Sequence, residues 1–451
     1  MKEAIKQNIL EAALQAKARN AAAIASLTDT VSLDRYSHLV RENSHGQIWT
    51  DALQRALHEH EVVVIPPSIE VYWLDSTIVI PSDRHIEAHG AVIRLVPEYP
   101  YVMLRNEHTQ DGTHLPIAPG SRDRNISIHG GQWEESCSRR GARRYGDVPG
   151  FYGVQTCMLF NNITGLTLTD MTFARATSFS VQVGDLTDGV FENFHFISCY
   201  ADGLHINGNS ENLYIRNFSG HVGDDLVALN MYDWLGSSIN YGPAKNIFCE
   251  EIHSAPDSRA KAMRLQPGMF FFDDGSAVDC AMENIYIRRV SGIYEYKLYL
   301  QTPPYRLGEQ PERTGIGSAD NVFFEDIVID TTENCPGYDR EAPFGLFMLN
   351  SRIGYLSLRN VEYRRGENVR PGVTLIAAGP MSWRHGDVEI FDPYVSGTVE
   401  MLDLDNITIN GESVSEVDKL VQVIAFQDVN RDGFSSGRGE IQRIRLNGKE
   451  F

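Results

Sequence analysis

The feature that most constrains the fold of this chain is an internal repeat. Alternating apolar residues, then a polar residue and a further apolar pair, recur along most of the chain, as in GLTLTDMTF (165–173). Counted at the polar position, Asp170, Asn193 and Asn217 are 23 and 24 residues apart. Because a unit of this length cannot bury its apolar face alone, the copies must stack on one another. Further copies lie at 189–196, 212–220, 246–254, 284–292, 321–329, 355–363 and 401–409, with similar runs at 85–93 and 125–133.

The repeat predicts an all-β fold, namely a right-handed parallel β-helix in which the short strands of successive coils pair in parallel. A leucine-rich repeat has a similar period, but it needs regular Leu and Asn positions that are missing here. A propeller blade needs a longer, four-stranded unit. The later polar positions are 34, 38 and 37 residues apart. These longer spacings indicate insertions, which in solenoids gather on one face and often build the functional site.

The N-terminal segment has a different pattern. Residues 1–45 are expected to be a helical extension, because Ala and Leu recur at helical spacing from Ile9 to Ala25. Leu53, Ala56 and Leu57 predict a second, short amphipathic helix. We expect an N-terminal helix to cap the open end of the stack, where strand edges would otherwise be exposed, or to form an oligomer contact. Residues 46–451 are expected to form a single β-helix domain, with last strands at 421–426 and 441–446.

Composition excludes several classes of protein. Lys plus Arg is 40 against 60 Asp plus Glu, and the formal charge of −20 repels polyanions, so no nucleic-acid partner is expected. No apolar run approaches the ~20 residues of a membrane span. The N-terminus lacks an apolar signal segment, so we expect a cytoplasmic protein with no membrane contact. The six cysteines form no CxxC pair, so no zinc site is expected, and neither is any other metal or cofactor.

Three acidic residues stand out between 198 and 234. Asp202 is followed by Gly203, and Asp224 and Asp225 follow Gly223 one repeat later. Residues one period apart occupy neighbouring coils ~4.8 Å apart, so the three carboxyls should lie side by side. Asp-Gly and Gly-Asp pairs are also ordinary turn signals. Two of them in consecutive coils, however, concentrate negative charge, which is costly unless the patch binds a cation or performs acid–base chemistry.

These residues resemble a known family. ADG followed by GDDLVALN looks like the NTDG and GDD(C)(I/V)A(I/L) signatures of polygalacturonase-type enzymes, glycoside hydrolase family 28. Over roughly residues 50–410 the coil pattern is also similar to the pectin-lyase-like β-helix superfamily. The resemblance implies an inverting hydrolase in which Asp224 is the general acid. It also implies that Asp202 and Asp225 hold the attacking water. Inversion usually places the acid and the base ~6.5–9.5 Å apart.

The basic residues of that family's substrate site are only partly matched. Its GHG histidine has no counterpart, and the corresponding stretch, 257–268, offers Arg259, Lys261 and Arg264 instead. Its RIK motif would fall near 294–301, where Lys297 is a loose match. Lys261, Arg264 and Lys297 are therefore the candidates for binding an acidic sugar.

Several other residues are weaker candidates for substrate contact. His205 could border the cleft, or alternation along its strand could point it elsewhere. Trp234 could stack on a sugar ring or pack under its own loop. Arg143 and Arg144 lie in a long interval between two coils. This interval is interpreted either as a lid that touches the ligand or as a solvated basic loop. The stretch 428–433 (DVNRDG) resembles a calcium loop, with Asp428, Asn430 and Asp432 at alternate positions. It lacks the acid at position twelve, which favours a hairpin turn.

The sequence therefore predicts an inverting glycoside hydrolase acting on an oligosaccharide, uronic or otherwise plant-derived, and leaves a homo-oligomer open. One alternative is a polysaccharide lyase, an epimerase or a sugar transferase on the same scaffold. In the lyase, Lys261, Arg264 or Lys297 would act as the base while the three Asp residues held calcium. The other alternative is a non-catalytic carbohydrate-binding β-helix, because this fold hosts several functions.

Overall fold

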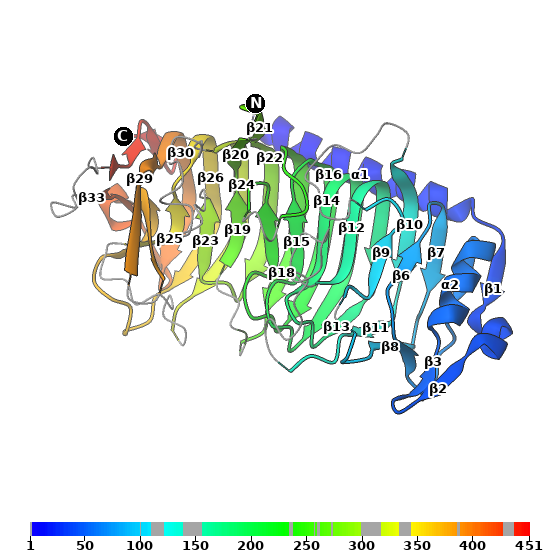
Figure 1. The fold of residues 1–451 in the computed structure, drawn as a ribbon. Coiled ribbons are helices and arrows are strands. Elements are labelled where there is room, and N and C mark those ends of the chain that lie inside the picture. Colours follow the sequence, from blue (N-terminus) through cyan, green and yellow to red (C-terminus); the bar gives the residue numbers. More distant parts are fainter. Residues whose placement is uncertain are drawn as a thin grey trace.

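The computed structural model shows a right-handed parallel β-helix, as predicted (Figure 1). It describes residues 2–99, 101–109, 121–138, 156–233, 238–256, 258, 262–271, 274–298, 317–332, 344–385, 388–426 and 437–451. Within these ranges no helix has both the length and the apolar character needed to cross a bilayer. The cysteines in these ranges are buried; they are Cys137, Cys157, Cys199, Cys249 and Cys280.

One side of the solenoid is built from long strands that pair in parallel from coil to coil. They are β7 (Arg84–Glu87), β10 (Asp123–His129), β12 (Thr156–Thr169), β14 (Phe179–Ile197), β16 (Ser210–Gly220), β18 (Ala244–Ser254), β22 (Met282–Ser291), β24 (Ser318–Asp330), β26 (Arg352–Arg364) and β30 (Thr398–Ile409). The pairing register stacks Ile215 on Cys249 and Cys249 on Ile287, all fully buried. The apolar positions of the repeat thus form continuous columns inside the coil.

The polar position of the repeat is the corner at which each coil bends. Asp170, Asn193 and Asn217 have φ values of 58°, 58° and 57°, in the left-handed region. Asn and Asp tolerate this conformation better than other residues with side chains do. Their side chains also form a ladder, since Asn193 donates a hydrogen bond to Asp170 at 2.8 Å and Asn217 donates to Asn193 at 2.7 Å.

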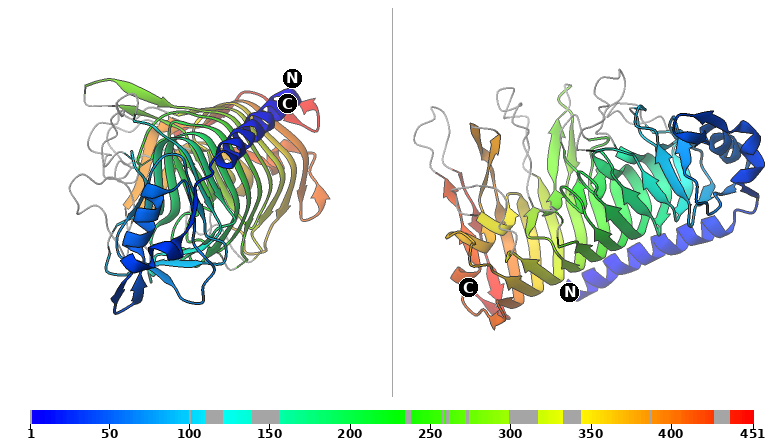
Figure 2. Two further views of the ribbon diagram at one scale, coloured as in Figure 1. Left: turned by 90° about the vertical axis from the view of Figure 1, so that its right-hand side faces the viewer. Right: turned by 90° about the horizontal axis from the view of Figure 1, so that it is seen from below.

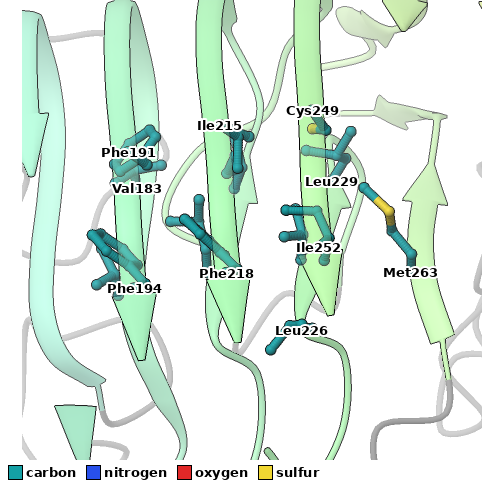
Figure 3. Close-up of a cluster of buried hydrophobic side chains, with 14 of the residues drawn as sticks. Val183, Phe191, Phe194, Ile215, Phe218, Leu226, Leu229, Cys249, Ile252 and Met263 are labelled. Atoms are coloured by element: carbon teal, nitrogen blue, oxygen red, sulfur yellow. The ribbon is translucent and has the colours of Figure 1, made fainter. Parts of the chain in front are cut away.

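A second series of shorter strands forms the face that carries the candidate site. It comprises β15 (Leu204–Asn207), β17 (Val227–Asn230), β19 (Ala262–Gln266), β23 (Glu295–Leu298), β25 (Phe344–Leu349), β27 (Val373–Ala378) and β32 (Val421–Val423). Residues alternate along these strands, so Leu229 and Met263 point into the core toward Ile215 and Ile252 of the long strands (Figure 3). The intervening residues point outward, which places His205 and Arg264 on the outer face.

Shorter elements complete the two ends of the stack and its side hairpins. At the N-terminal end they are β1 (Thr30–Ser32), η1 (Leu33–Leu39), β2 (Arg41–Asn43), β3 (Gly46–Ile48), β4 (Val62–Val64), β5 (Tyr72–Leu74), β6 (Ile78–Ile80), β8 (Val92–Leu95), β9 (Leu104–Asn106), β11 (Gln132–Glu134) and β13 (Thr172–Ala174). Toward the C-terminal end they are β20 (Gly268–Phe271), β21 (Ala277–Cys280), β28 (Pro380–His385), β29 (Val388–Ser396), β31 (Glu412–Ser413), η4 (Val417–Lys419), β33 (Ala425–Phe426), β34 (Gly437–Arg438), β35 (Glu440–Ile441), β36 (Ile444–Leu446) and β37 (Lys449–Glu450).

Two helices precede the regular coils, and they do different things. α2 (Thr50–Glu59) covers the N-terminal end of the stack with its buried residues Leu53, Ala56 and Leu57, as expected of a cap (Figure 2). α1 (Lys2–Ala25) instead runs along the flank, parallel to the axis of the solenoid (Figure 2). The division of the chain at residue 45 stays a prediction.

The track beneath α1 is an apolar column contributed by successive long strands. Tyr214, Phe248 and Tyr286 stack in register, and Ile9 and Ala13 of α1 pack against them. The next outward column alternates in charge, because Glu192, Arg216, Glu250, Arg288, Glu325, Arg359 and Asp405 are register partners from coil to coil. The flank is therefore as periodic as the core.

Candidate functional site

The candidate site is built where two coils turn into β15 and β17. The register aligns Leu204 with Val227, and the backbone N–H of Asp225 donates to Asp202 Oδ1 at 3.1 Å. Both glycines of the motif are required by this close stacking. A Cβ on Gly203 would lie 2.6 Å from the carbonyl oxygen of Leu226, and one on Gly223 would lie 2.4 Å from that of Tyr200. The close approach of the two coils therefore explains both glycines, and it brings the acids next to each other.

The three predicted carboxyls do come together. One oxygen from each of Asp202, Asp224 and Asp225 lies within 4.8 Å of the others. They differ in depth, because Asp225 is fully buried and Asp202 is 3% exposed, whereas the side chain of Asp224 is 19% exposed. Only Asp224 thus has a carboxyl that reaches the surface appreciably.

Burial and charge together determine the ionisation of Asp225. Burial raises the pKa of its carboxyl well above the usual range, and Arg264 opposes this shift. The negative charges of Asp224 and Asp202 raise the pKa further. The cluster consequently retains a proton at a pH at which isolated carboxyls have lost theirs.

Arg264 supplies the nearest positive charge. Its Nε lies 2.9 Å from Asp225 Oδ2, and its terminal nitrogen lies 3.8 Å from Asp224 Oδ1. Ala228 is the register partner of Arg264 on β17, and its small side chain leaves the guanidinium room beside the acids. The same three carboxyls are close enough together to coordinate a cation, but Arg264 already provides positive charge there.

Lys297 occupies the next position of this outward column, in register with Arg264. Its side chain is 8% exposed, and its Nζ lies 2.8 Å from Oε1 of the fully buried Glu295. Both predicted cations that the structure describes are therefore brought toward the site, but each faces a carboxylate of the protein.

His205 lies beneath the surface rather than at the edge of a cleft. Its ring is 1% exposed and stacks on Phe179, with ring centroids 3.9 Å apart. The two ring nitrogens face Asp202 and Asp233. Alternation along β15 thus places His205 outward, but the ring is covered there, and its contact with substrate stays a prediction.

Asp233 and Glu295 were missed by the sequence reasoning. Asp233 lies three residues after the end of β17, the strand that follows the Asp224–Asp225 pair. Glu295 precedes Lys297 by two residues. Both are buried acids. An acid two residues from a cation on one strand shares its face, which is a signal that could have revealed Glu295.

The remaining predicted positions lie outside the described residues. They are Arg143, Arg144, Trp234, Arg259, Lys261, Asp428, Asn430 and Asp432. Their proposed roles stay predictions.

A second group that could ligate a metal occurs near the start of the solenoid, at Glu107, His108 and Asp123. Asp123 is fully buried and accepts hydrogen bonds from Asn106, Ser82 and both the backbone and the ring of His108. These bonds already saturate its oxygens, so this group anchors the strand rather than presenting open ligands.

Comparison with known proteins shows the fold. No protein-family model and no curated protein matches this sequence. The chain is similar to a hyperthermoactive exopolygalacturonase from Thermotoga maritima, with 12% identity and a TM-score of 0.53 over 100% of this chain and 97% of the other. It is also similar to a mutant tailspike protein of E. coli bacteriophage HK620, solved with a pentasaccharide. Here the identity is 12% and the TM-score 0.50, over 86% of this chain and 64% of the other. The chain thus has a polygalacturonase-type β-helix fold.

Proposed function

We propose that this chain is an inverting glycoside hydrolase that cleaves an oligosaccharide. The observation that carries the proposal is the clustering of Asp202, Asp224 and Asp225 from two successive coils, with their oxygens within 4.8 Å. Glycoside hydrolysis requires one carboxyl that donates a proton and another that is ionised, and neighbouring acids in unlike environments supply both states.

The exposures of the three acids support different roles. Asp224 is the most exposed, so it is the one that could protonate the glycosidic oxygen of a bound sugar. Asp202 and Asp225 lie behind it, and in this proposal they hold the attacking water. As the glycosidic bond breaks, the leaving sugar gains the proton of Asp224. The water gives its own proton to Asp202 as its oxygen bonds to the anomeric carbon.

The stereochemical outcome is a separate question. At least one oxygen of each carboxyl lies within 4.8 Å of one oxygen of each of the others, which is closer than the ~6.5–9.5 Å usual between the two carboxyls of inverting enzymes. We nevertheless propose inversion, because the buried carboxyls of Asp202 and Asp225 are poorly placed to bond directly to a sugar. Proton NMR of the first-formed anomer tests this, and retention of configuration would show that an Asp acts as nucleophile.

The pairing of the cations bears on the class of sugar. Arg264 faces Asp225, and Lys297 faces Glu295. A cation that is already paired gains less from a second anion, so we propose that a uronic carboxylate is not required for binding. Hydrolysis of a uronic oligosaccharide should be compared with that of its carboxyl-reduced counterpart. A strict requirement for the carboxylate would refute this part of the proposal.

The experiment that tests the hydrolase itself is a screen of oligosaccharides with reducing-end detection. Its companion variants are Asp224→Asn and the matched control Asp326→Asn. Asp326 is an exposed corner residue with φ 57°, where Asn is tolerated. Hydrolysis that is lost in the first variant and kept in the second supports the proposal. Equal activity in both would overturn it.

A further inference from the structure

The His205 ring is held between two buried carboxylates. Its Nδ1 lies 2.6 Å from Asp202 Oδ2, and its Nε2 lies 2.9 Å from Asp233 Oδ2. The side chains of Asp202 and Asp233 are 4% and 2% exposed. All three groups are thus almost removed from water, where a charge persists only if an opposite charge meets it.

This geometry determines where the protons lie. A carboxylate oxygen only accepts hydrogen bonds, and a neutral imidazole has a single N–H. With both Asp side chains ionised, the ring therefore has to carry both protons. The positive ring then offsets part of the negative charge of the two acids. Without it, two negative charges would be buried close to each other.

The surroundings of the ring add no competing charge among the described residues. Phe179 covers one face of the ring in a nearly parallel stack, with an interplanar angle of 11°. The register partners on the flanking strands are Gln182 and Ala228, and neither titrates. The amide of Asn207 lies 3.3 Å from Nε2, and Asn230 donates to Asp233 at 3.4 Å. The charged groups that face His205 are accordingly Asp202 and Asp233.

Asp202 is held from both sides. His205 occupies its Oδ2, and the backbone N–H of Asp225 occupies its Oδ1. We propose that the charged ring of His205 and Asp233 are positioning residues, which fix the carboxylate of Asp202 next to Asp225. The catalytic consequence rests on the proposed function, in which Asp202 helps to hold the water. In this arrangement Asp233 acts through His205 and does not touch the sugar.

The charge of the ring can be measured without any substrate. The acids outweigh the effect of burial, which lowers the pKa of His205, and raise it to about 9. In the wild-type protein labelled with ¹⁵N-histidine, the resonances that vanish in His205→Gln identify this ring. We expect them to be those of a doubly protonated ring at pH 7, with a midpoint near 9. A ring that is neutral at pH 7 would overturn the proposal.

Asp233→Asn separates a positioning role from mere packing. Loss of one counter-charge should lower the His205 midpoint by about one to three pH units. The basic limb of the kcat profile should move with it, while KM changes less than about twofold. Asp326→Asn is the control and should change neither. Asp233→Glu keeps the charge and should restore part of both values; it also serves if the Asn variant does not fold.

The two proposals fail differently. A displaced NMR midpoint without any change in the kcat profile would show that Asp233 and His205 only stabilise the fold, and would refute the positioning role. An Asp224→Asn variant that stays active would refute the hydrolase instead, whatever the charge of His205.

Discussion

The flank beneath α1 and the face that carries the acids are two sides of the same coils, yet they use charge in opposite ways. On the flank, Arg216 and Arg288 meet Glu250 at 3.4 and 2.8 Å in a column that alternates in sign. Both arginines are partly exposed there, so solvent screens the pairs. On the site face, Asp202, Asp225 and Glu295 are buried and depend on specific cations. The alternating charges of the flank follow from regular stacking. The buried acids of the site face lower the stability of the protein, and a function would explain why they are there.

The largest expected effect concerns activity on the site face. Asp202→Asn and Asp224→Asn should each lower kcat on an identified oligosaccharide about 10²- to 10⁴-fold, the usual contribution of a general acid or base. Thermal unfolding of Asp224→Asn should stay close to that of the wild type, because this side chain is partly exposed. Loss of activity that merely follows loss of folded protein would contradict the assignment.

The flank should show the reverse behaviour. Phe248 is fully buried between Tyr214 and Tyr286 under α1. Phe248→Ala should lower the free energy of unfolding by about 3–5 kcal/mol through the cavity it leaves. The kcat per folded molecule should not change. Urea unfolding followed by circular dichroism measures the first quantity, and Phe248→Leu should lose markedly less. A large change in kcat would show that the two faces are coupled.

The buried ring of His205, held between Asp202 and Asp233, predicts that the stability of the protein depends on pH. Because the pKa of His205 is raised to about 9, the folded protein binds this proton more tightly than the unfolded chain does. The contribution is complete below about pH 6.5 and is lost as the pH rises through about 9. The slope should reach about 1.4 kcal/mol per pH unit in this window. Urea unfolding across the window measures it. In Asp233→Asn the loss should end at a lower pH and should be smaller in total, because the pKa of the folded ring lies nearer that of the unfolded chain. An identical profile in both proteins would argue against a charged ring.

The smallest expected effect concerns a single corner of the coil. Asn217 is exposed, with φ 57°. Asn217→Ala should cost about 1–2 kcal/mol, because Ala lacks the polar side chain that allows Asn to adopt the left-handed region. Asn217→Gly should lose less, since glycine adopts this conformation without strain. Melting temperatures of the two variants test this, and equal losses would mean that the amide ladder, rather than backbone strain, is what matters.

The repeat was enough to predict most of the fold. The polar position was identified from its spacing alone, and the structure shows why Asn193 and Asn217 stand there, since the chain bends into the left-handed region at each coil. The path of α1 was not predicted. Its pattern indicated a helix, but nothing local shows that Tyr214, Phe248 and Tyr286 of three coils form one column for it.

The site was predictable in part for the same reason. Asp202 and the Asp224–Asp225 pair are about one period apart, so their contact follows from stacking. The surroundings of His205 were not predictable, because Asp233 lies beyond the end of β17 and approaches the ring through the path of the chain. The burial of Asp225 likewise depends on how neighbouring coils cover it.

The sequence by itself determined that the chain coils and which acids become neighbours, because parallel pairing converts a fixed offset in the chain into adjacency in space. Only the tertiary structure decided how deep each acid lies and which cation or imidazole faces it. Those properties arise where coils of unequal length meet, and at such places no period relates one residue to the next.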